Sequence, residues 1–220
     1  MTNGVMYIAF GEKAKNELTK NAIRNFPVVV VDEKIYNLKS PFVGTGKFSF
    51  RAGAVKPYLY DYSPFDKTLY LDVDTIIKKD VTCGFDFLEE NDICVSYHVK
   101  PNGDIWYVDE IFNHLLSPPI SETSVEERNL TQKMIGKRMP FINTGVIFFR
   151  KSENAKKFFE TWYKEWKIFS SWDEQMAAHR AFCLTPDLKI KLLPPIWNQK
   201  YESKDTIISH AMGKQSARKE

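Results

Sequence analysis

Short runs of β-branched and apolar residues alternate along the chain with longer segments whose apolar positions recur every three or four residues. The short runs are typical of strands, and the longer segments are typical of amphipathic helices. The predicted strands are residues 5–10, 27–32, 68–77, 92–97, 141–150, 190–193 and 206–209. The predicted helices are residues 12–25, 50–62, 85–90, 105–116, 152–169 and 172–183. This alternation predicts an α/β fold with a central sheet flanked by helices.

The residue pattern of some segments predicts whether they are buried or exposed. The run of four valines within residues 27–32 does not alternate, which predicts a strand covered on both faces. Phe158, Trp162 and Trp166 recur every four residues, so we expect this helix face to pack in the core. Residues 33–47 and 117–139 show little periodicity, and we expect surface loops there.

The length and composition narrow the class of protein. A chain of 220 residues favours one domain, 1–220. It ends in a polar tail without an apolar anchor, so we hypothesise that the native chain continues as a longer protein with this as its N-terminal domain. A net charge of +3 argues against a nucleic-acid partner.

The cysteines and the N-terminal sequence bear on where in the cell the protein acts. The three cysteines, Cys83, Cys94 and Cys183, form no metal-binding or disulfide pattern, which favours a reducing compartment. The sequence shows neither a signal peptide nor a transmembrane segment, so we expect a cytoplasmic protein.

Two carboxylates interrupt the strongest apolar run. Asp72 and Asp74 are two residues apart within the predicted strand 68–77, so their side chains are expected on one face. Neighbouring carboxylates repel each other unless a cation lies between them, and Mg²⁺ or Mn²⁺ would satisfy them through oxygen ligands. The alternative is a solvated strand end with two unrelated acids.

The stretch Tyr70-Leu-Asp-Val-Asp-Thr75 resembles the D-x-D signature of nucleotide-sugar glycosyltransferases with the GT-A fold. The order of the surrounding elements is similar to that of retaining members such as family eight, and the compactness is similar to glycosyltransferase domains of large algal viruses. The resemblance implies a single Rossmann-like domain with a mixed central sheet. It also implies transfer from a UDP-sugar donor to a hydroxyl of a carbohydrate or glycoprotein acceptor, with retention, using Mn²⁺ or Mg²⁺. A viral protein would act in the host cytoplasm.

The resemblance assigns a metal site. It implies that Asp72 contacts both metal and ribose, that Asp74 chelates the metal, and that His210 is the third ligand. The family follows this histidine with Gly and Lys, matched here by Gly213 and Lys214, although the family's usual spacing and its Pro-Trp are missing. A structural histidine is the alternative for His210. An imidazole ligand would favour Mn²⁺ over Mg²⁺.

Cationic and nucleotide-binding candidates follow from the same resemblance. Arg51 and Lys56 occupy the region where the family places cations near the diphosphate, and Lys214 would neutralise the leaving group. Five residues apart on a helix, Arg51 and Lys56 diverge by ~140°, so they converge only if Arg51 precedes the helix. A solvated cation is the alternative for Arg51.

The ends of the first two predicted strands are a further candidate for nucleotide binding. They carry Phe10, Gly11 and Asp32, where a nucleotide docks in an open α/β sheet.

Two further elements resemble the family's sugar-binding residues. Asp173 and Glu174 match its D-Q or D-E element, and either would be the base to test in an inverting reaction. Ser171 and Glu174 also fit a helix capping box. Asn143 and Gly145 match an Asn-x-Gly element, where a bulge brings the Asn143 amide near the sugar; a plain bulge is the alternative.

The aromatic content, 14%, exceeds what a core of this size needs. We expect Trp106, Tyr107, Trp172 and Trp197 near substrate loops, where flat rings can stack on a sugar. His98, His114 and His179 lack the spacing of metal ligands, and we expect structural roles for them.

Two other functions compete with sugar transfer. Asp72, Asp74 and Thr75 also resemble the D-x-D-x-T motif of haloacid-dehalogenase-like phosphatases, although the threonine stands one position early. That family carries its motif on an early strand, whereas about seventy residues precede Asp72, and no suitable acidic pair follows it. The third possibility is a non-catalytic module that binds carbohydrate or nucleotide.

Overall fold

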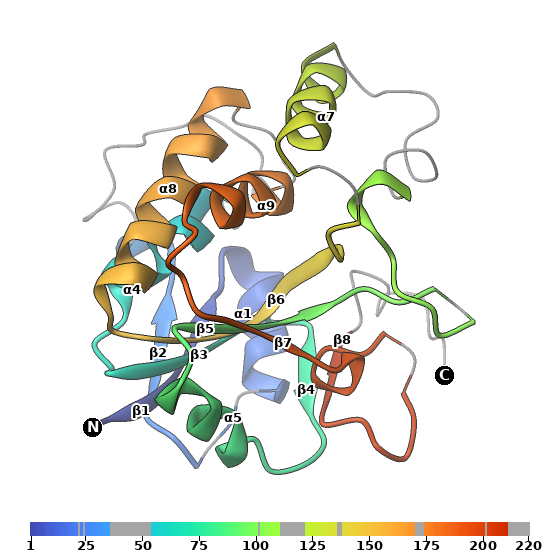
Figure 1. Ribbon diagram of the computed structural model, residues 1–220. Helices are drawn as coiled ribbons and strands as arrows, with labels where there is room; N and C mark the ends of the chain where they lie inside the picture. The colour runs from blue at the N-terminus through green and yellow to red at the C-terminus, as the bar shows by residue number, and fades with distance from the viewer. Residues whose placement is uncertain are drawn as a thin grey trace.

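A mixed six-stranded sheet forms the centre of the protein (Figure 1). The computed structural model describes residues 1–21, 23, 25–35, 54–100, 102–110, 122–135, 138–169, 174–200 and 202–210. The sheet order is β2-β1-β3-β6-β5-β7. Its strands are β1 Asn3–Ile8, β2 Val28–Val31, β3 Lys67–Leu71, β5 Ile93–Tyr97, β6 Ile142–Arg150 and β7 Ile190–Leu193. Only β6 runs antiparallel to its neighbours, which confirms the predicted mixed sheet.

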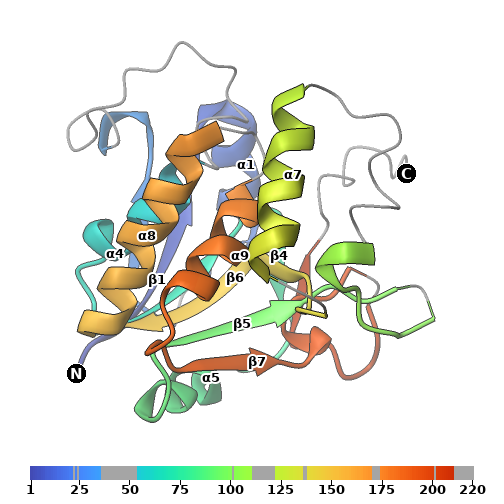
Figure 2. The ribbon, with the colours of Figure 1, turned by 45° about the horizontal axis from the view of Figure 1, so that its top comes forward.

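Helices cover both faces of this sheet. Their bounds are α1 Gly11–Asn21, η1 Lys56–Tyr58, α4 Leu59–Tyr62, α5 Thr82–Asp86, η2 Phe87–Glu89, α7 Glu122–Ile135, α8 Glu153–Phe169, α9 Glu174–Leu184 and η3 Pro195–Trp197. Figure 2 shows α7, α8 and α9 side by side, with α9 between the other two. In the part of the chain that the structure describes, no helix has the length and apolar character that a membrane crossing requires.

Alternating side chains of the central strands supply two hydrophobic cores. On β1, Met6 and Ile8 join the cluster beneath α8 and α9, whereas Val5 and Tyr7 join the cluster on the opposite face. The helical stripe represented by Phe158 and Trp162 is fully buried, as its spacing predicts. Burial on both faces therefore holds β1 in the interior of the molecule.

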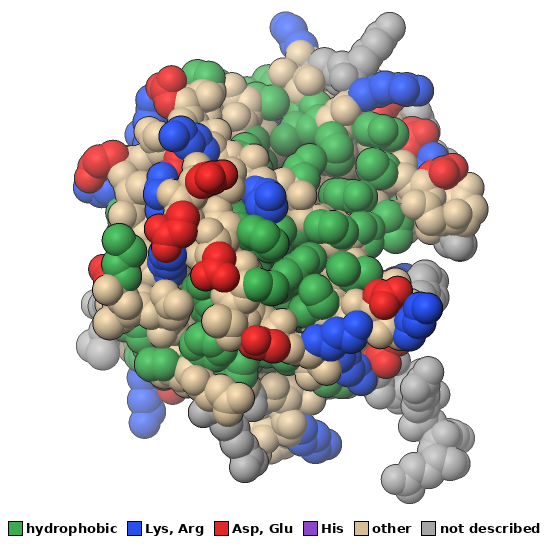
Figure 3. Space-filling view, turned by 60° about the horizontal axis from the view of Figure 1, so that its bottom comes forward, with side chains coloured by type: hydrophobic (Ala, Val, Ile, Leu, Met, Phe, Trp, Pro, Cys, Tyr) green, Lys and Arg blue, Asp and Glu red, His purple; other side chains and the backbone are tan. Residues whose placement is uncertain are grey.

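The second face of the sheet is covered by shorter elements. Phe85 of α5 and Trp197 of η3 both pack edge-on against Phe148 of β6. Partly exposed apolar side chains such as Phe87 and Ile196 surround them, and Figure 3 shows hydrophobic side chains gathered where the bottom of the molecule comes forward. The expectation that Trp197 lies on a substrate loop is wrong, because its ring fills this core.

The strand β2 differs from its prediction. It pairs only with β1 at one edge of the sheet, and Val28 is 38% exposed. The valine run is therefore not covered on both faces. An edge strand has fewer neighbours to bury it, which the run of valines alone does not reveal.

The segment expected to be a loop at 117–139 contains the helix α7, so that expectation is wrong. The reason is that α7 docks through polar groups. The fully buried guanidinium of Arg180 donates hydrogen bonds to Glu127 (3.1 Å) and Thr131 (2.7 Å) of α7 and to Glu165 (2.8 Å) of α8. A helix held by buried charges carries no apolar periodicity to detect.

The predicted strand 68–77 is two strands in different sheets. After β3 the chain turns at Asp72, whose carbonyl accepts hydrogen bonds from the backbone N–H and the hydroxyl of Thr75. β4, Thr75–Ile77, then pairs antiparallel with β8, Ile208–His210. The two aspartates thus lie at a corner and not within a strand, which corrects the sequence interpretation.

The predicted helix 105–116 is also partly wrong. Ile105 and Tyr107 form isolated β-bridges with Val99 and Pro140, and helical structure begins only at Val108. The rest of that segment, including His114, lies outside the described residues.

His179 makes stability depend on pH. Its ring stacks on Phe141 at 5.1 Å, and burial lowers its pKa to about 4. The unfolded chain, with an ordinary histidine pKa, binds the proton more tightly, so stability falls as pH drops from about 6.5 towards 4. Between pH 7.0 and 5.0 we expect wild type to lose about 1–2 kcal/mol more unfolding free energy than His179→Gln. Urea titrations at both pH values measure this, and equal losses would contradict it.

Candidate functional site

The polar candidates meet at one edge of the main sheet. β1, β2 and β3 run parallel, so their carboxyl ends lie at the same edge. Asp72 directly follows β3 there, and its backbone N–H donates to the carbonyl of Gly145 in β6 at 2.8 Å. Phe10, Gly11 and Asp32 follow β1 and β2 at this edge.

Asp72, Asp74 and His210 come together although 136 residues separate the last two. The β4–β8 pairing sets His210 opposite Thr75, beside the aspartates. Its Nε2 lies 3.1 Å from an oxygen of Asp74 and 3.7 Å from an oxygen of Asp72. One ligand atom from each residue lies within 4.8 Å of the others, a spacing that could hold a metal ion.

The hydrogen bonds of His210 suit a metal ligand. Asn198 donates its amide N–H to the carbonyl of Asn143, which directs its Oδ1 at His210 Nδ1, 2.7 Å away. Nδ1 therefore donates, and in the neutral ring the lone pair of Nε2 faces the two carboxylates. Three electron-rich groups then converge and require a proton or a cation between them.

Gly145 allows this convergence. A Cβ at this position would lie 2.2 Å from Cε1 and 2.7 Å from Nδ1 of His210, and 2.9 Å from Oδ2 of Asp72. All three distances are below ordinary contact. The glycine thus matters here for close approach of side chains to the backbone, as expected for a glycine within a strand.

Lys56 lies between two carboxylates. Its buried ammonium is 3.1 Å from Asp72 Oδ1 and 2.8 Å from Glu174 Oε1. Burial alone would lower the pKa of Lys56, but the charges of Asp72 and Glu174 outweigh it and raise the pKa above its ordinary value. The ammonium of Lys56 thus joins the D-x-D corner to α9, and its predicted place near a diphosphate stays a prediction. Tyr70 also donates its hydroxyl hydrogen to Asp72.

The predicted bulge in β6 lies between Asn143, which pairs with Ser96, and Ile147, which pairs with Val95. The pairing with β5 shifts between Val95 and Ser96, which confirms an irregularity at this point. Asn143 accepts a hydrogen bond from the backbone N–H of Gly145 through its own amide oxygen, at 2.9 Å. Thr144 donates its hydroxyl to Glu174 (2.9 Å) and its backbone N–H to the amide oxygen of Gln175 (3.2 Å). The bulge therefore holds the first turn of α9.

The residues that the sequence predicts near a nucleotide, at the ends of β1 and β2, make contacts with neighbouring parts of the chain. Phe10 is buried, and Gly11 adopts a φ of 79° and donates its N–H to Glu33. Asp32 accepts hydrogen bonds from the N–H groups of Lys34 (3.0 Å) and Ile35 (3.1 Å), which caps a short helical turn. Their nucleotide-binding roles stay predictions.

Several candidates lie outside the described residues, namely Arg51, Ser171, Trp172, Asp173, Gly213 and Lys214. Sequence reasoning in turn missed Tyr70, Thr144 and Asn198. Thr144 carries a detectable signal, because it is the middle residue of the Asn-x-Gly element. Asn198 follows η3 and is buried, but nothing in its local sequence distinguishes it from a loop asparagine.

Comparison with known proteins identifies the family. Residues 67–199 match the model of the nucleotide-diphospho-sugar transferase family, which covers more than half of the chain. The chain therefore belongs to this family. No curated protein matches it in sequence.

Solved structures resemble the chain in fold. The bifunctional glycosyltransferase WbbM in apo form has a TM-score of 0.56 at 17% identity, over 90% of this chain and 39% of that chain. Mouse xyloside xylosyltransferase 1, also apo, has a TM-score of 0.54 at 12% identity, over 96% and 97%. An active-site variant of LgtC has a TM-score of 0.51 at 13% identity, over 94% and 86%.

These matches decide the class of protein. The fold is that of the GT-A glycosyltransferases, and the family match makes the protein a glycosyltransferase that uses nucleotide-sugars. They favour sugar transfer over both the phosphatase and the non-catalytic binding module.

The Lys56 bridge predicts a large effect on stability. In Lys56→Met the carboxylates of Asp72 and Glu174 lose their shared cation, and we expect unfolding free energy to fall by about 3 kcal/mol. Lys67→Met is the matched control, since Lys67 is equally buried but pairs with one exposed carboxylate, Glu89. Its loss should be clearly smaller. Denaturant titration measures both, and equal losses would contradict a special role for the bridge.

Proposed function

We propose that the protein is a metal-dependent, retaining glycosyltransferase that moves a sugar from a UDP-sugar to a hydroxyl of a carbohydrate or glycoprotein. The observation that carries the metal dependence is the convergence of Asp72, Asp74 and the Nε2 lone pair of His210. This mixed oxygen and nitrogen donor set fits Mn²⁺ better than Mg²⁺, which prefers oxygen alone. When bound, the ion would neutralise negative charge on the diphosphate leaving group.

The residues of the chain would divide the work of binding. Asp72, Asp74 and His210 would hold the ion, with Asp72 also contacting the ribose, while Phe10, Gly11 and Asp32 would flank the nucleotide. Arg51, Gly213 and Lys214 remain candidates for the diphosphate, where Arg51 and Lys214 would stabilise the developing charge. Lys56 remains a candidate near the diphosphate, and its contacts with Asp72 and Glu174 would also hold these two residues in a fixed geometry.

In the proposed reaction, the acceptor hydroxyl oxygen bonds to the anomeric carbon while the bond from that carbon to the β-phosphate oxygen breaks. Attack on the face of the leaving group gives retention, and the hydroxyl proton passes to the departing phosphate, so no strong base is needed. The contacts of Glu174 support a mechanism without a strong base. Its carboxylate pairs with Lys56 and accepts a hydrogen bond from Thr144, and both contacts compete with a proton for that carboxylate. Glu174, Asp173 and Asn143 would then orient the transferred sugar.

Isothermal titration of UDP tests the metal dependence. In Mn²⁺ we expect UDP to bind at least ten times more tightly than in EDTA, and Asp74→Asn should remove most of this difference because it removes an anionic ligand. Asp205→Asn is the matched control on the exposed surface and should behave as wild type. Equal affinity in Mn²⁺ and EDTA would refute metal-dependent donor binding. A panel of nucleotide-sugars scored for hydrolysis would then identify the donor.

Gly145→Ala tests the geometry of the ligand cluster. The added methyl group would displace His210 and Asp72, so we expect Mn²⁺ affinity to fall by about 10–100-fold. Gly103→Ala is the control; a Cβ there meets nothing within 4 Å, and its φ of +92° affects only stability. Calorimetry of Mn²⁺ binding measures both variants. An unchanged affinity in Gly145→Ala would show that the three residues do not bind the ion together.

A further inference from the structure

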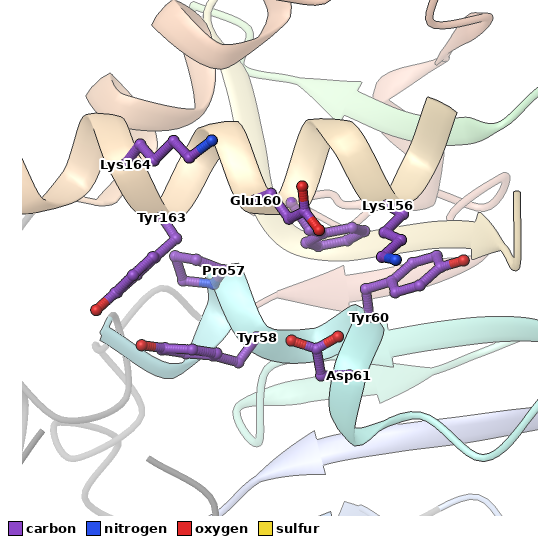
Figure 4. Close-up of a pocket in the computed structure, with 9 residues that line it drawn as sticks. Pro57, Tyr58, Tyr60, Asp61, Lys156, Glu160, Tyr163 and Lys164 are labelled. Atoms are coloured by element: carbon purple, nitrogen blue, oxygen red, sulfur yellow. The ribbon is translucent and has the colours of Figure 1, made fainter. Parts of the chain in front are cut away.

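A cavity lies between α8 and the η1–α4 turn (Figure 4). Its volume is about 140 Å³, and none of the residues that line it belongs to the Asp72–Asp74–His210 cluster. Drug-sized ligands occupy pockets of about 300 Å³ or more, so this one suits a single sugar ring or a molecule of that size.

Aromatic side chains form the walls of this cavity. Tyr58 and Tyr163 pack directly against each other, with ring centroids 4.8 Å apart and ring planes tilted by 49°, and the Tyr60 ring lies 6.1 Å from that of Phe159. Tyr60 is held in place because its hydroxyl donates to the carbonyl of Ser152 at 3.2 Å. The cavity therefore offers fixed, flat apolar surfaces, on which the C–H groups of a ligand can pack.

The charged side chains that line the cavity are balanced in number. Asp61 and Glu160 contribute two carboxylates and Lys156 and Lys164 contribute two ammonium groups. All four are exposed, and no ion pair joins any of them within the described part of the chain. The balance favours neither an anion nor a cation, while carboxylates accept and ammonium groups donate hydrogen bonds. Such a rim suits a neutral ligand that carries several hydroxyl groups.

We propose that this cavity is a secondary glycan-binding site that takes one neutral monosaccharide unit. Its rings would pack on the apolar face of the sugar, and Asp61, Glu160, Lys156 and Lys164 would bind the hydroxyl groups. The choice of a sugar rests on the proposed function, because a glycosyltransferase that extends a glycan gains from holding the chain at a second point. The same η1 turn begins with Lys56, so the cavity and the D-x-D corner share one structural element.

Saturation-transfer NMR with methyl glycosides of glucose, galactose, mannose, xylose and N-acetylglucosamine tests this site. The experiment is done in EDTA and without nucleotide, so that the Asp72–Asp74–His210 cluster does not contribute to binding. We expect at least one glycoside to bind in the millimolar range, Tyr163→Ala to weaken it at least ten-fold and Glu160→Gln to weaken it several-fold. Lys157→Ala, on the same helix but outside the cavity, is the matched control and should bind as wild type.

Three results would overturn the proposal. They are binding of none of the glycosides, binding that both variants leave unchanged, and binding of tetramethylammonium in place of the sugars. Glu160→Gln changes an exposed residue, so it keeps the test decisive if Tyr163→Ala fails to fold. Titration of UDP with Mn²⁺ on the same proteins separates the two sites. Tyr163→Ala should keep metal-dependent UDP binding, whereas a failure of the donor site would appear there and leave glycoside binding intact.

Discussion

The ammonium of Lys56 lies between two carboxylates that reach it from distant parts of the chain. Asp72 comes from the end of β3 and Glu174 from the start of α9. Two acids that contact one ammonium would repel each other without it, and the shared cation links the sheet to the helix. Because Asp72 also belongs to the D-x-D corner, the position of the helix and the geometry of the ligand cluster depend on the same ion pairs.

The bulge in β6 and the side chain of Arg180 complete this framework. In the β6 bulge, Gly145 has no side chain, so His210 can approach Asp72. The neighbouring Thr144 donates hydrogen bonds to both Glu174 and Gln175. Further along α9, Arg180 binds α7 and α8 through Glu127 and Glu165. α9 is thus held by buried charges at its start and in its middle, and these contacts give the first turn of the helix a rigid support.

Much of the fold is predictable because burial follows local periodicity. The core strands and the Phe158 and Trp162 stripe have such patterns, and they lie where expected. The wrong predictions concern segments whose environment is set by contacts with distant parts of the chain. α7 packs through Glu127 and Thr131, so it lacks an apolar pattern, and the valines of β2 occupy an edge that their composition does not indicate. Trp197 likewise fills a core that only the tertiary structure defines.

The sequence by itself indicated the class of chemistry, because the stretch Tyr70 to Thr75 resembles the D-x-D signature of nucleotide-sugar glycosyltransferases and the family match agrees with it. Only the tertiary structure decided the partners. The chain turns at Asp72, because the backbone bonds to Gly145 and Thr75, and β4 continues in a second sheet. Pairing with β8 then delivers His210, and Asn198 orients its ring. Such contacts join residues far apart in the chain, so no local pattern encodes them.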